Sequence, residues 1–141
     1  MIEVWDGEAN LLPLATSWMN EAVPGEYNVY KGMKDLREMH DDEFSDVLVL
    51  KDFLGKVVGA MGIQVHDVFF TDRSYAAIRY WYVLPRFRWL ARSFIKGAMR
   101  WAARHDCESL LVCSSKLCPN SDKFLKRMKF KVFETVYAGD V

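Results

Sequence analysis

Residues that would mark a disulfide-bonded or metal-stabilised protein are scarce in this chain of 141 residues. It has three cysteines, at Cys107, Cys113 and Cys118. An odd number without a Cys-x-x-Cys spacing indicates neither a disulfide framework nor a zinc site. Histidine is also rare, and His40 stands in a contiguous run with acidic residues whose side chains point in different directions. We therefore expect no bound metal.

Long apolar runs, a signal peptide and a net charge are also missing. No stretch is long enough to span a bilayer, and the N-terminus lacks a basic flank followed by an apolar core. We therefore expect a soluble, cytoplasmic protein that does not act at a membrane. The 19 basic and 19 acidic residues give a formal net charge of zero, which argues against a dedicated nucleic-acid-binding protein.

Charge is nevertheless unevenly distributed along the chain. Residues 1–48 hold 11 acidic and 3 basic side chains, whereas residues 86–129 hold 11 basic and 3 acidic ones. This polarity suits an anionic ligand at the second region, or docking between unlike faces of neighbouring molecules. The alternative is a solvated helix face without a partner.

The spacing of apolar residues predicts a single domain over residues 1–141. Strands are expected over 2–5, 46–51, 56–64, 75–83, 109–113 and 131–137, and helices over 11–22, 31–40, a long stretch after Pro85, and 120–128. Residues 66–74 are polar enough for a loop, although Val68-Phe69-Phe70 could extend the preceding hairpin. This order predicts an α/β (α+β) fold with about four helices and a mixed, mostly antiparallel sheet, whose strands 75–83 and 109–113 are parallel neighbours that splay apart near Val83.

The segment from Tyr75 to Ser114 connects this fold to chemistry. β-Branched and aromatic residues make 75–83 a strong strand, and Pro85 ends it because proline cannot donate a hydrogen bond to the sheet. A strand that runs directly into a helix leaves free backbone N–H groups at the start of the helix. Together with the helix dipole, these groups favour an anion, most often a phosphate.

This segment resembles the GCN5-related N-acetyltransferase (GNAT) family. In that family a strand ending in Val-x-Pro precedes an Arg/Gln-x-x-Gly-x-Gly/Ala loop that binds the pyrophosphate of acetyl-CoA, and here Val83-Leu84-Pro85 and Arg88 match that pattern. Farther on, Phe124 and Phe130 align with the aromatic positions of the motif that ends the family's fold. The resemblance implies an acetyl-CoA site formed by Tyr82, Val83, Arg88, Trp89, Leu90, Ala91, Arg92 and Ser93.

Several positions depart from the family's motifs. In the phosphate loop Ala91 and Ser93 do not supply the glycines that let the backbone approach phosphates closely, and Trp89 stands where a glycine often occurs. Near the end of the chain Leu125 replaces the tyrosine that usually serves as general acid, and Lys129 replaces a glycine. The resemblance therefore covers the fold, while the catalytic pattern is eroded.

Candidates for acid-base catalysis are few. Acetyl transfer to an amine needs a base, an acid near the thiolate and a donor for the developing oxyanion. Tyr80 and Tyr82 share a face of the expected central strand and could relay a proton, although tyrosines in such strands are more often packing residues. Asp67 and Asp72 are expected in the loop before this strand, and neither is a convincing base.

The long helix has an apolar face and a basic face. Basic residues recur every four positions, at Arg88, Arg92, Lys96, Arg100 and Arg104. Like charges at this spacing repel one another unless something anionic faces them. The pattern predicts CoA phosphates at the first two positions and a protein partner or assembly along Arg92 to Arg104, and the alternative is an exposed face neutralised by salt.

Two functions are compatible with these observations. The first is a non-catalytic structural or binding component, because Lys123-Phe124-Leu125-Lys126 resembles acetyltransferase-like virion proteins of tailed bacteriophages. That resemblance implies a location in the host cytoplasm or the virion. The second is an acetyl-CoA-dependent N-acetyltransferase acting on an unknown amine, and an acyl-CoA binder without transfer lies between the two. The departures from the motifs favour the first function.

Overall fold

The computed structural model describes residues 1–68, 70–114, 118 and 121–141. Its strands form a sheet in the order β1-β2-β3-β4-β5, with bounds β1 (Ile2–Val4), β2 (Ser45–Lys51), β3 (Val57–Asp67), β4 (Ser74–Val83) and β5 (Ser109–Val112). The helices are α1 (Leu12–Ala22), α2 (Val29–Asp41), α3 (Ala91–Arg104) and α4 (Ser121–Arg127), with a 3-10 helix (Pro85–Leu90) directly before α3. None of the helices in the described ranges is long and apolar enough to cross a membrane.

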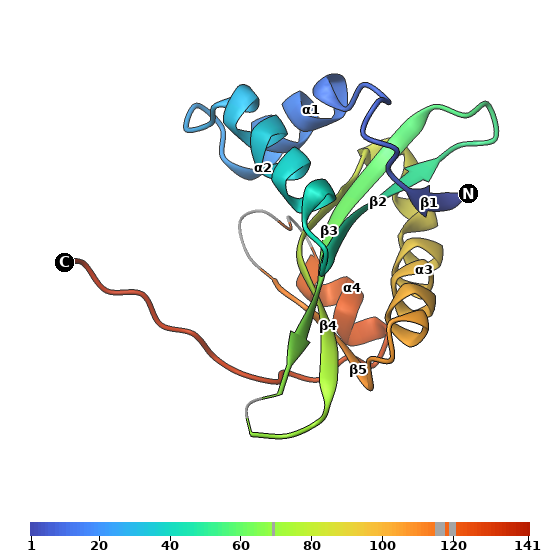
Figure 1. Ribbon diagram of the computed structural model, residues 1–141. Coiled ribbons are helices and arrows are strands. Elements are labelled where there is room, and N and C mark those ends of the chain that lie inside the picture. The colour runs from blue at the N-terminus through green and yellow to red at the C-terminus, as the bar shows by residue number, and fades with distance from the viewer. Residues whose placement is uncertain (69, 115–117, 119–120) are drawn as a thin grey trace.

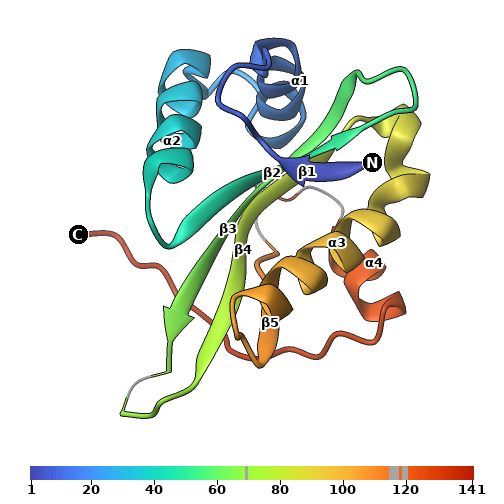
Figure 2. The same cartoon turned by 45° about the vertical axis from the view of Figure 1, so that its right-hand side comes forward.

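The sheet is mixed, and its one parallel pair among the described strands is incomplete. Strands β1 to β4 pair antiparallel with their neighbours, whereas β5 runs parallel to β4 from Ser109 opposite Tyr75 to Val112 opposite Ile78. The end of β4 up to Val83 extends beyond this parallel pairing. Helices α1 and α2 cover one face of the sheet, and α3 and α4 cover the other (Figure 1, Figure 2). The predicted mixed sheet with splayed parallel strands is confirmed.

Alternating side chains of the strands build a hydrophobic core on each face of the sheet, as the period of two in extended backbone requires. The core under α3 and α4 includes Leu48, Leu50, Met61, Ile63, Trp81, Val83, Phe94, Ile95 and Ala98. The core under α1 and α2 includes Trp5, Leu14, Trp18, Val47, Val49, Ala60 and Tyr82. The two cores hold the central strands between two helical layers.

A register shift in the β3–β4 pair changes the alternation of β4. Tyr80 lies opposite Gly62, whereas Ile78 lies opposite the next residue, Ile63, so Arg79 has no partner across the pair. One extra residue in a strand is a β-bulge, which bends the strand and re-aims the side chains that follow. Trp81 and Val83 lie an odd number of positions after Ile78, so regular alternation would place them on the other face of the sheet. Because of the bulge they lie with Ile78 in the core under α3.

The β3–β4 hairpin is longer than the sequence predicts. Strand β3 extends to Asp67, so His66 and Asp67 belong to a strand and not to a loop. The loop is closed by the Val68 N–H group, which donates to the Arg73 carbonyl at 2.9 Å. The alternative extension through Val68-Phe69-Phe70 includes Phe69, which lies outside the described residues, as does Asn120 at the predicted start of the last helix.

The predicted strand 131–137 is wrong for the chain in this structure. Residues 131–141 form neither helix nor strand, and all of them are exposed. A strand needs a neighbour for its backbone N–H and C=O groups, and none of the strand pairs among the described residues includes this segment, whose end leaves the body of the molecule (Figure 1). The segment has the composition of a strand, but it lacks a paired neighbour among the described strands.

We expect the core under α3 to dominate stability. Phe94 is fully buried on α3, so Phe94→Ala should lower the free energy of unfolding by about 3–5 kcal/mol through lost burial and a new cavity. Met99 on the same helix is 41% exposed, and Met99→Ala should cost less than about 1 kcal/mol. Urea denaturation of both variants measures the difference. Equal losses would show that α3 is not packed as described.

Candidate functional site

A small cavity lies where β4 continues beyond its pairing with β5. It has a volume of about 90 Å³ and is lined by Trp81, Tyr82, Val83, Arg88, Ala91, Ser121 and Phe124. Its wall is mostly apolar, and the hydroxyl of Ser121 is turned to the backbone, donating to the Cys118 carbonyl at 2.8 Å. The splayed strands therefore leave a cleft at the position predicted for the cofactor, but a narrow one.

A cluster of three polar side chains lies at this cleft. Glu21 of α1 accepts hydrogen bonds from Arg88 Nη2 at 2.6 Å to both carboxylate oxygens, and from the Tyr82 hydroxyl at 2.9 Å. The guanidinium also lies over the Tyr82 ring, 5.7 Å from its centroid. The Arg88 and Glu21 side chains are only 34% and 27% exposed, so the ion pair is partly shielded from water. The pair joins α1 to the segment before α3.

Arg88 is also bound to the end of the central strand. Its Nε donates to the Val83 carbonyl at 3.2 Å, while Nη2 is held by Glu21. The guanidinium therefore already donates to a backbone acceptor of Val83, a residue that lines the cavity.

The helix after β4 begins earlier than the sequence predicts. The sequence predicts that β4 runs directly into a long helix with free amides, but a 3-10 helix (Pro85–Leu90) lies between β4 and α3. The Phe87 N–H donates to the Leu84 carbonyl at 2.8 Å, and the Ala91 N–H donates to the Arg88 carbonyl. Because the 3-10 helix continues into α3, the amide at the start of α3 already has a partner, and the first amides of the helical segment belong to the 3-10 helix.

The residues predicted to bind acetyl-CoA do not converge on one site. Four of them, Tyr82, Val83, Arg88 and Ala91, line the cavity. Trp89 is 74% exposed and does not line the cavity, Leu90 packs against the core, and Arg92 and Ser93 are exposed. The cavity of about 90 Å³ does not fit acetyl-CoA in this arrangement, because pockets for such ligands commonly hold about 300–1,000 Å³.

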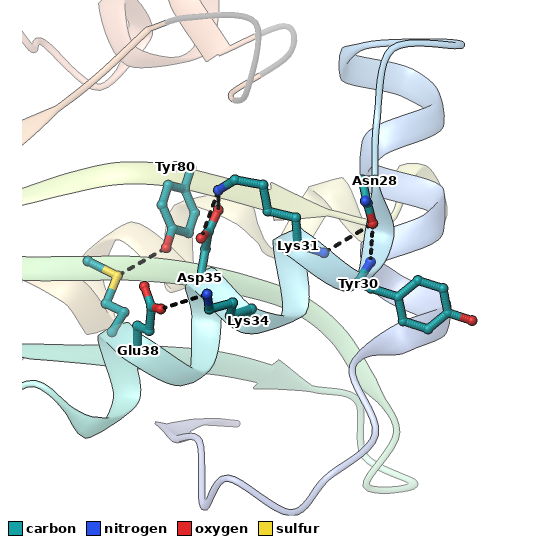
Figure 3. A network of polar contacts seen from close by, with 8 residues as sticks. Asn28, Tyr30, Lys31, Lys34, Asp35, Glu38 and Tyr80 are labelled. Carbon is teal, nitrogen blue, oxygen red and sulfur yellow. Dashed lines mark hydrogen bonds and ion pairs between the residues drawn. The ribbon is translucent and has the colours of Figure 1, made fainter.

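Tyr80 and Tyr82 share the face of β4 toward α1, as predicted. Trp18 contacts both, with ring centroids 5.6 Å from Tyr80 and 5.8 Å from Tyr82. The Tyr80 hydroxyl donates to Met39 Sδ at 3.2 Å (Figure 3). Burial raises the pKa of each tyrosine to about 12, with the Glu21 hydrogen bond as a second cause at Tyr82. Both hydroxyls stay protonated near neutral pH, so neither serves as a base.

The other catalytic candidates lie away from the cleft. Asp67 is the last residue of β3 and accepts a hydrogen bond from the Ser74 hydroxyl at 3.0 Å, at the opposite end of β4 from Val83. Asp72 is exposed in the same hairpin. His40 packs against Trp5, with ring centroids 5.3 Å apart. Among the described residues, no group of three or more histidine, cysteine or acidic residues could hold a metal ion.

A second cavity of about 100 Å³ lies between α1, α2 and β4. Its lining is mostly apolar and comprises Ala15, Trp18, Met19, Val29, Gly32, Asp35, Leu36 and Tyr80. The Asp35 carboxylate is paired with Lys31 Nζ at 2.8 Å, one turn away on α2, and Lys34 pairs with Glu38 in the same way (Figure 3). These four charged side chains of α2 therefore pair with one another along its surface.

The basic residues of α3 have no acidic partner in the described part of the chain, whereas Lys31 and Lys34 of α2 each have one. Arg92, Lys96, Arg100 and Arg104 are all exposed. None of the ion pairs found among the described residues includes any of the four. The predicted basic face therefore exists, and its charge is not neutralised by the described part of the chain.

We expect the buried tyrosines to make stability fall at high pH. The folded pKa of Tyr80 is about 12 against an ordinary 10.0, so the unfolded chain loses this proton first and the free energy of unfolding decreases between about pH 10 and 12. Below about pH 10 the contribution is fully present. Urea denaturation across this range should show a shallower decrease for Tyr80→Phe than for wild type. Tyr137→Phe, at a side chain 91% exposed, is the control and should behave as wild type.

Comparisons with known proteins bear on the fold. A scan against models of known families finds no match, and neither does a search of curated proteins. Solved structures match the whole chain. A protein described as a transcriptional regulator from Bacillus halodurans superposes with a TM-score of 0.80 at 13% identity, covering 100% of this chain and 99% of that one.

Two acetyltransferase structures give the same result. A GNAT family acetyltransferase from Staphylococcus aureus has a TM-score of 0.74 at 12% identity and covers 100% of this chain and 98% of its own. An aminoglycoside 6'-N-acetyltransferase from Acinetobacter haemolyticus has a TM-score of 0.72 at 16% identity, with coverage of 100% and 97%. The chain therefore has the fold of the GNAT acetyltransferases.

Proposed function

We propose that this chain is a non-catalytic member of the GNAT fold that serves as a structural or binding component. The observation that carries the proposal is the ion pair between Glu21 and Arg88 at the mouth of the cleft, with Nη2 at 2.6 Å from both carboxylate oxygens. This ion pair holds Arg88, the arginine that matches the family's phosphate loop. The pair is partly shielded from solvent.

Electrostatics explains why the ion pair between Glu21 and Arg88 opposes binding of a cofactor in the cleft. Displacing Arg88 would leave the Glu21 carboxylate, only 27% exposed, beside the phosphates of the incoming ligand. Two anions at close range repel, and a partly buried carboxylate that loses its hydrogen-bonded partner has lost a favourable interaction as well. The same residue that positions the arginine therefore disfavours a phosphate.

The basic face of α3 is the surface through which such a component would act. Four exposed cations with no acidic partner among the residues that the structure describes attract an acidic protein surface, and this attraction governs orientation and association rate. We propose that the partner is another protein of an assembly, and that the assembly is the virion of a tailed bacteriophage. The short similarity around Phe124 supports this assembly.

An N-acetyltransferase acting on an unknown amine is the second candidate. One observation favours it: Trp89, which could have filled the cleft, is 74% exposed and does not line the cavity. Two of the three similar structures named above are described as acetyltransferases, which supports acetyl-CoA as the ligand of that fold. A cleft opened by movement of Arg88 would be required.

We expect acetyl-CoA at about 1 mM to leave the melting temperature of the wild-type protein unchanged, because a ligand stabilises a fold only by binding it. Glu21→Ala frees Arg88 and removes the opposing carboxylate. Acetyl-CoA should therefore slightly raise the melting temperature of this variant. Differential scanning fluorimetry with and without the ligand makes the measurement.

The control is Arg88→Ala combined with Arg92→Ala, which should show no rise. A rise in the wild-type protein that this double variant abolishes, together with release of CoA thiol in the presence of a panel of amines, would establish the acetyltransferase instead.

Reversal of charge on α3 should separate partner binding from folding. Exposed charges contribute little to stability, so Lys96→Glu with Arg100→Glu should melt within a few degrees of wild type. Capture from a lysate of the source cell, with mass spectrometry, should show an acidic protein that binds the wild type, binds less as salt is raised, and fails to bind this variant.

Lys34→Glu with Lys56→Glu is the matched control, because it changes net charge equally at exposed positions outside α3. It should retain the acidic partner. If both double variants capture the same proteins as wild type, the basic face is an ordinary solvated surface.

A further inference from the structure

The turn that follows α2 carries acidic side chains around one exposed aromatic ring. Asp41, Asp42 and Glu43 are exposed, and the next residue, Phe44, is 59% exposed. The Asp42 carboxylate holds the turn in shape, because it accepts hydrogen bonds from the Phe44 N–H at 3.0 Å and from the Ser45 hydroxyl at 3.1 Å. Neither Asp41 nor Glu43 takes part in an ion pair with the residues that the structure describes.

A second acidic segment lies beside this turn. The loop after β1 contains the exposed residues Asp6 and Glu8, and the carbonyl of Gly7 between them accepts a hydrogen bond from Arg37 Nη1 at 3.1 Å. Arg37 belongs to the C-terminal half of α2, and its guanidinium lies over the Trp5 ring, 5.4 Å from the centroid. The two segments together form an acidic corner, which comprises Asp6, Glu8, Asp41, Asp42 and Glu43.

The basic face of α3 has the opposite charge and an exposed apolar side chain of its own. Met99 is 41% exposed. It follows Lys96 by three positions and Arg92 by seven, so it shares their side of the helix. Protein interfaces commonly place aromatic and methionine side chains at the centre and charged groups at the rim. Each of the two surfaces therefore offers an apolar centre, and their surrounding charges are complementary.

The two surfaces of one molecule face away from each other. The turn after α2 lies on one side of the sheet and α3 on the other (Figure 2). None of the ion pairs among the described residues joins the acidic corner to α3. A neighbouring copy can bring the two surfaces together, and a formal net charge of zero adds no overall repulsion between copies.

We propose that the acidic corner of one copy of this chain docks on the basic face of α3 of a second copy, with Phe44 packed against Met99 and the carboxylates of the corner facing the cations. The inference rests on the proposed function, since it uses the same basic face, and it names a partner for that face. Because the two surfaces lie on opposite sides of each molecule, the contact is heterologous and continues from copy to copy.

Sedimentation velocity of the full chain at low and high salt tests the proposal. Wild type at about 100 µM should form oligomers in about 25 mM salt and dissociate in about 300 mM salt, because ions screen exposed charges. Asp41→Lys with Glu43→Lys leaves Asp42 intact and should raise the dissociation constant at least about tenfold. Glu26→Lys with Asp72→Lys changes the net charge equally at exposed positions outside the acidic corner, and it should leave the constant unchanged.

Mixing two charge-reversed variants separates this contact from other forms of association. Lys96→Glu with Arg100→Glu should be monomeric alone, and so should Asp41→Lys with Glu43→Lys, because each has lost one of the two complementary surfaces. An equimolar mixture should associate again, since the intact acidic corner of the first variant meets the intact basic face of the second.

The apolar part of the contact has its own test. Phe44→Ala changes no charge and should raise the dissociation constant at least about fivefold. Phe53→Ala, at a side chain 95% exposed in the loop between β2 and β3, should leave it unchanged, and both variants should melt within a few degrees of wild type.

A wild type that stays monomeric at low salt would overturn this inference, as would a mixture that fails to associate or a Phe44→Ala variant that associates like wild type. The proposed function fails by a different result, in which the basic-face variant captures the same proteins from a lysate as wild type.

Discussion

The bulge in β4 is the constraint on which the rest of the structure depends. Arg79 has no partner across the β3–β4 pair, and the parallel pairing with β5 ends beside it, at Ile78. Opposite the bulge, Gly62 leaves room for its neighbours, since a Cβ there would lie 2.5 Å from Met39 Sδ and 2.8 Å from the Tyr80 ring. The strand can therefore leave β5 while both of its faces stay packed, and the departure creates the cleft.

The cleft that this geometry opens is then filled by side chains of the protein itself. Glu21 and Arg88 come from opposite helical layers and meet at the end of β4, where Arg88 also caps the Val83 carbonyl. A backbone acceptor left unpaired by the splay is satisfied in this way without a ligand. The contacts that fill the cleft therefore also connect α1 to the end of β4.

Elements held by local interactions and the position of the cleft could be predicted from the sequence, but the contacts that fill the cleft could not. The strand before Val83 and the apolar face of α3 follow from residue type and spacing. Glu21 gives no such signal, because it lies 61 and 67 residues from its partners. Pro85 correctly predicts that β4 ends before it. Proline also favours the first position of a helix, and this explains why a 3-10 helix begins at Pro85 where the sequence predicts a turn before the long helix. The segment 131–137 has strand propensity without an available neighbour, which propensity alone cannot reveal.

The distribution of charge moves any attraction for anions from the cleft to the outside of the molecule. Inside the cleft, the positive charge of Arg88 is already balanced by Glu21, so a phosphate would gain little from the arginine and would face a carboxylate. Along α3, exposed cations recur without acidic partners in the described chain, and α3 lies on the face of the sheet opposite the two N-terminal helices (Figure 2). An acidic surface that docks there meets a row of cations at no cost in broken ion pairs. For a molecule with this arrangement, the exposed cations of α3 attract an anionic group more readily than the paired Arg88 does.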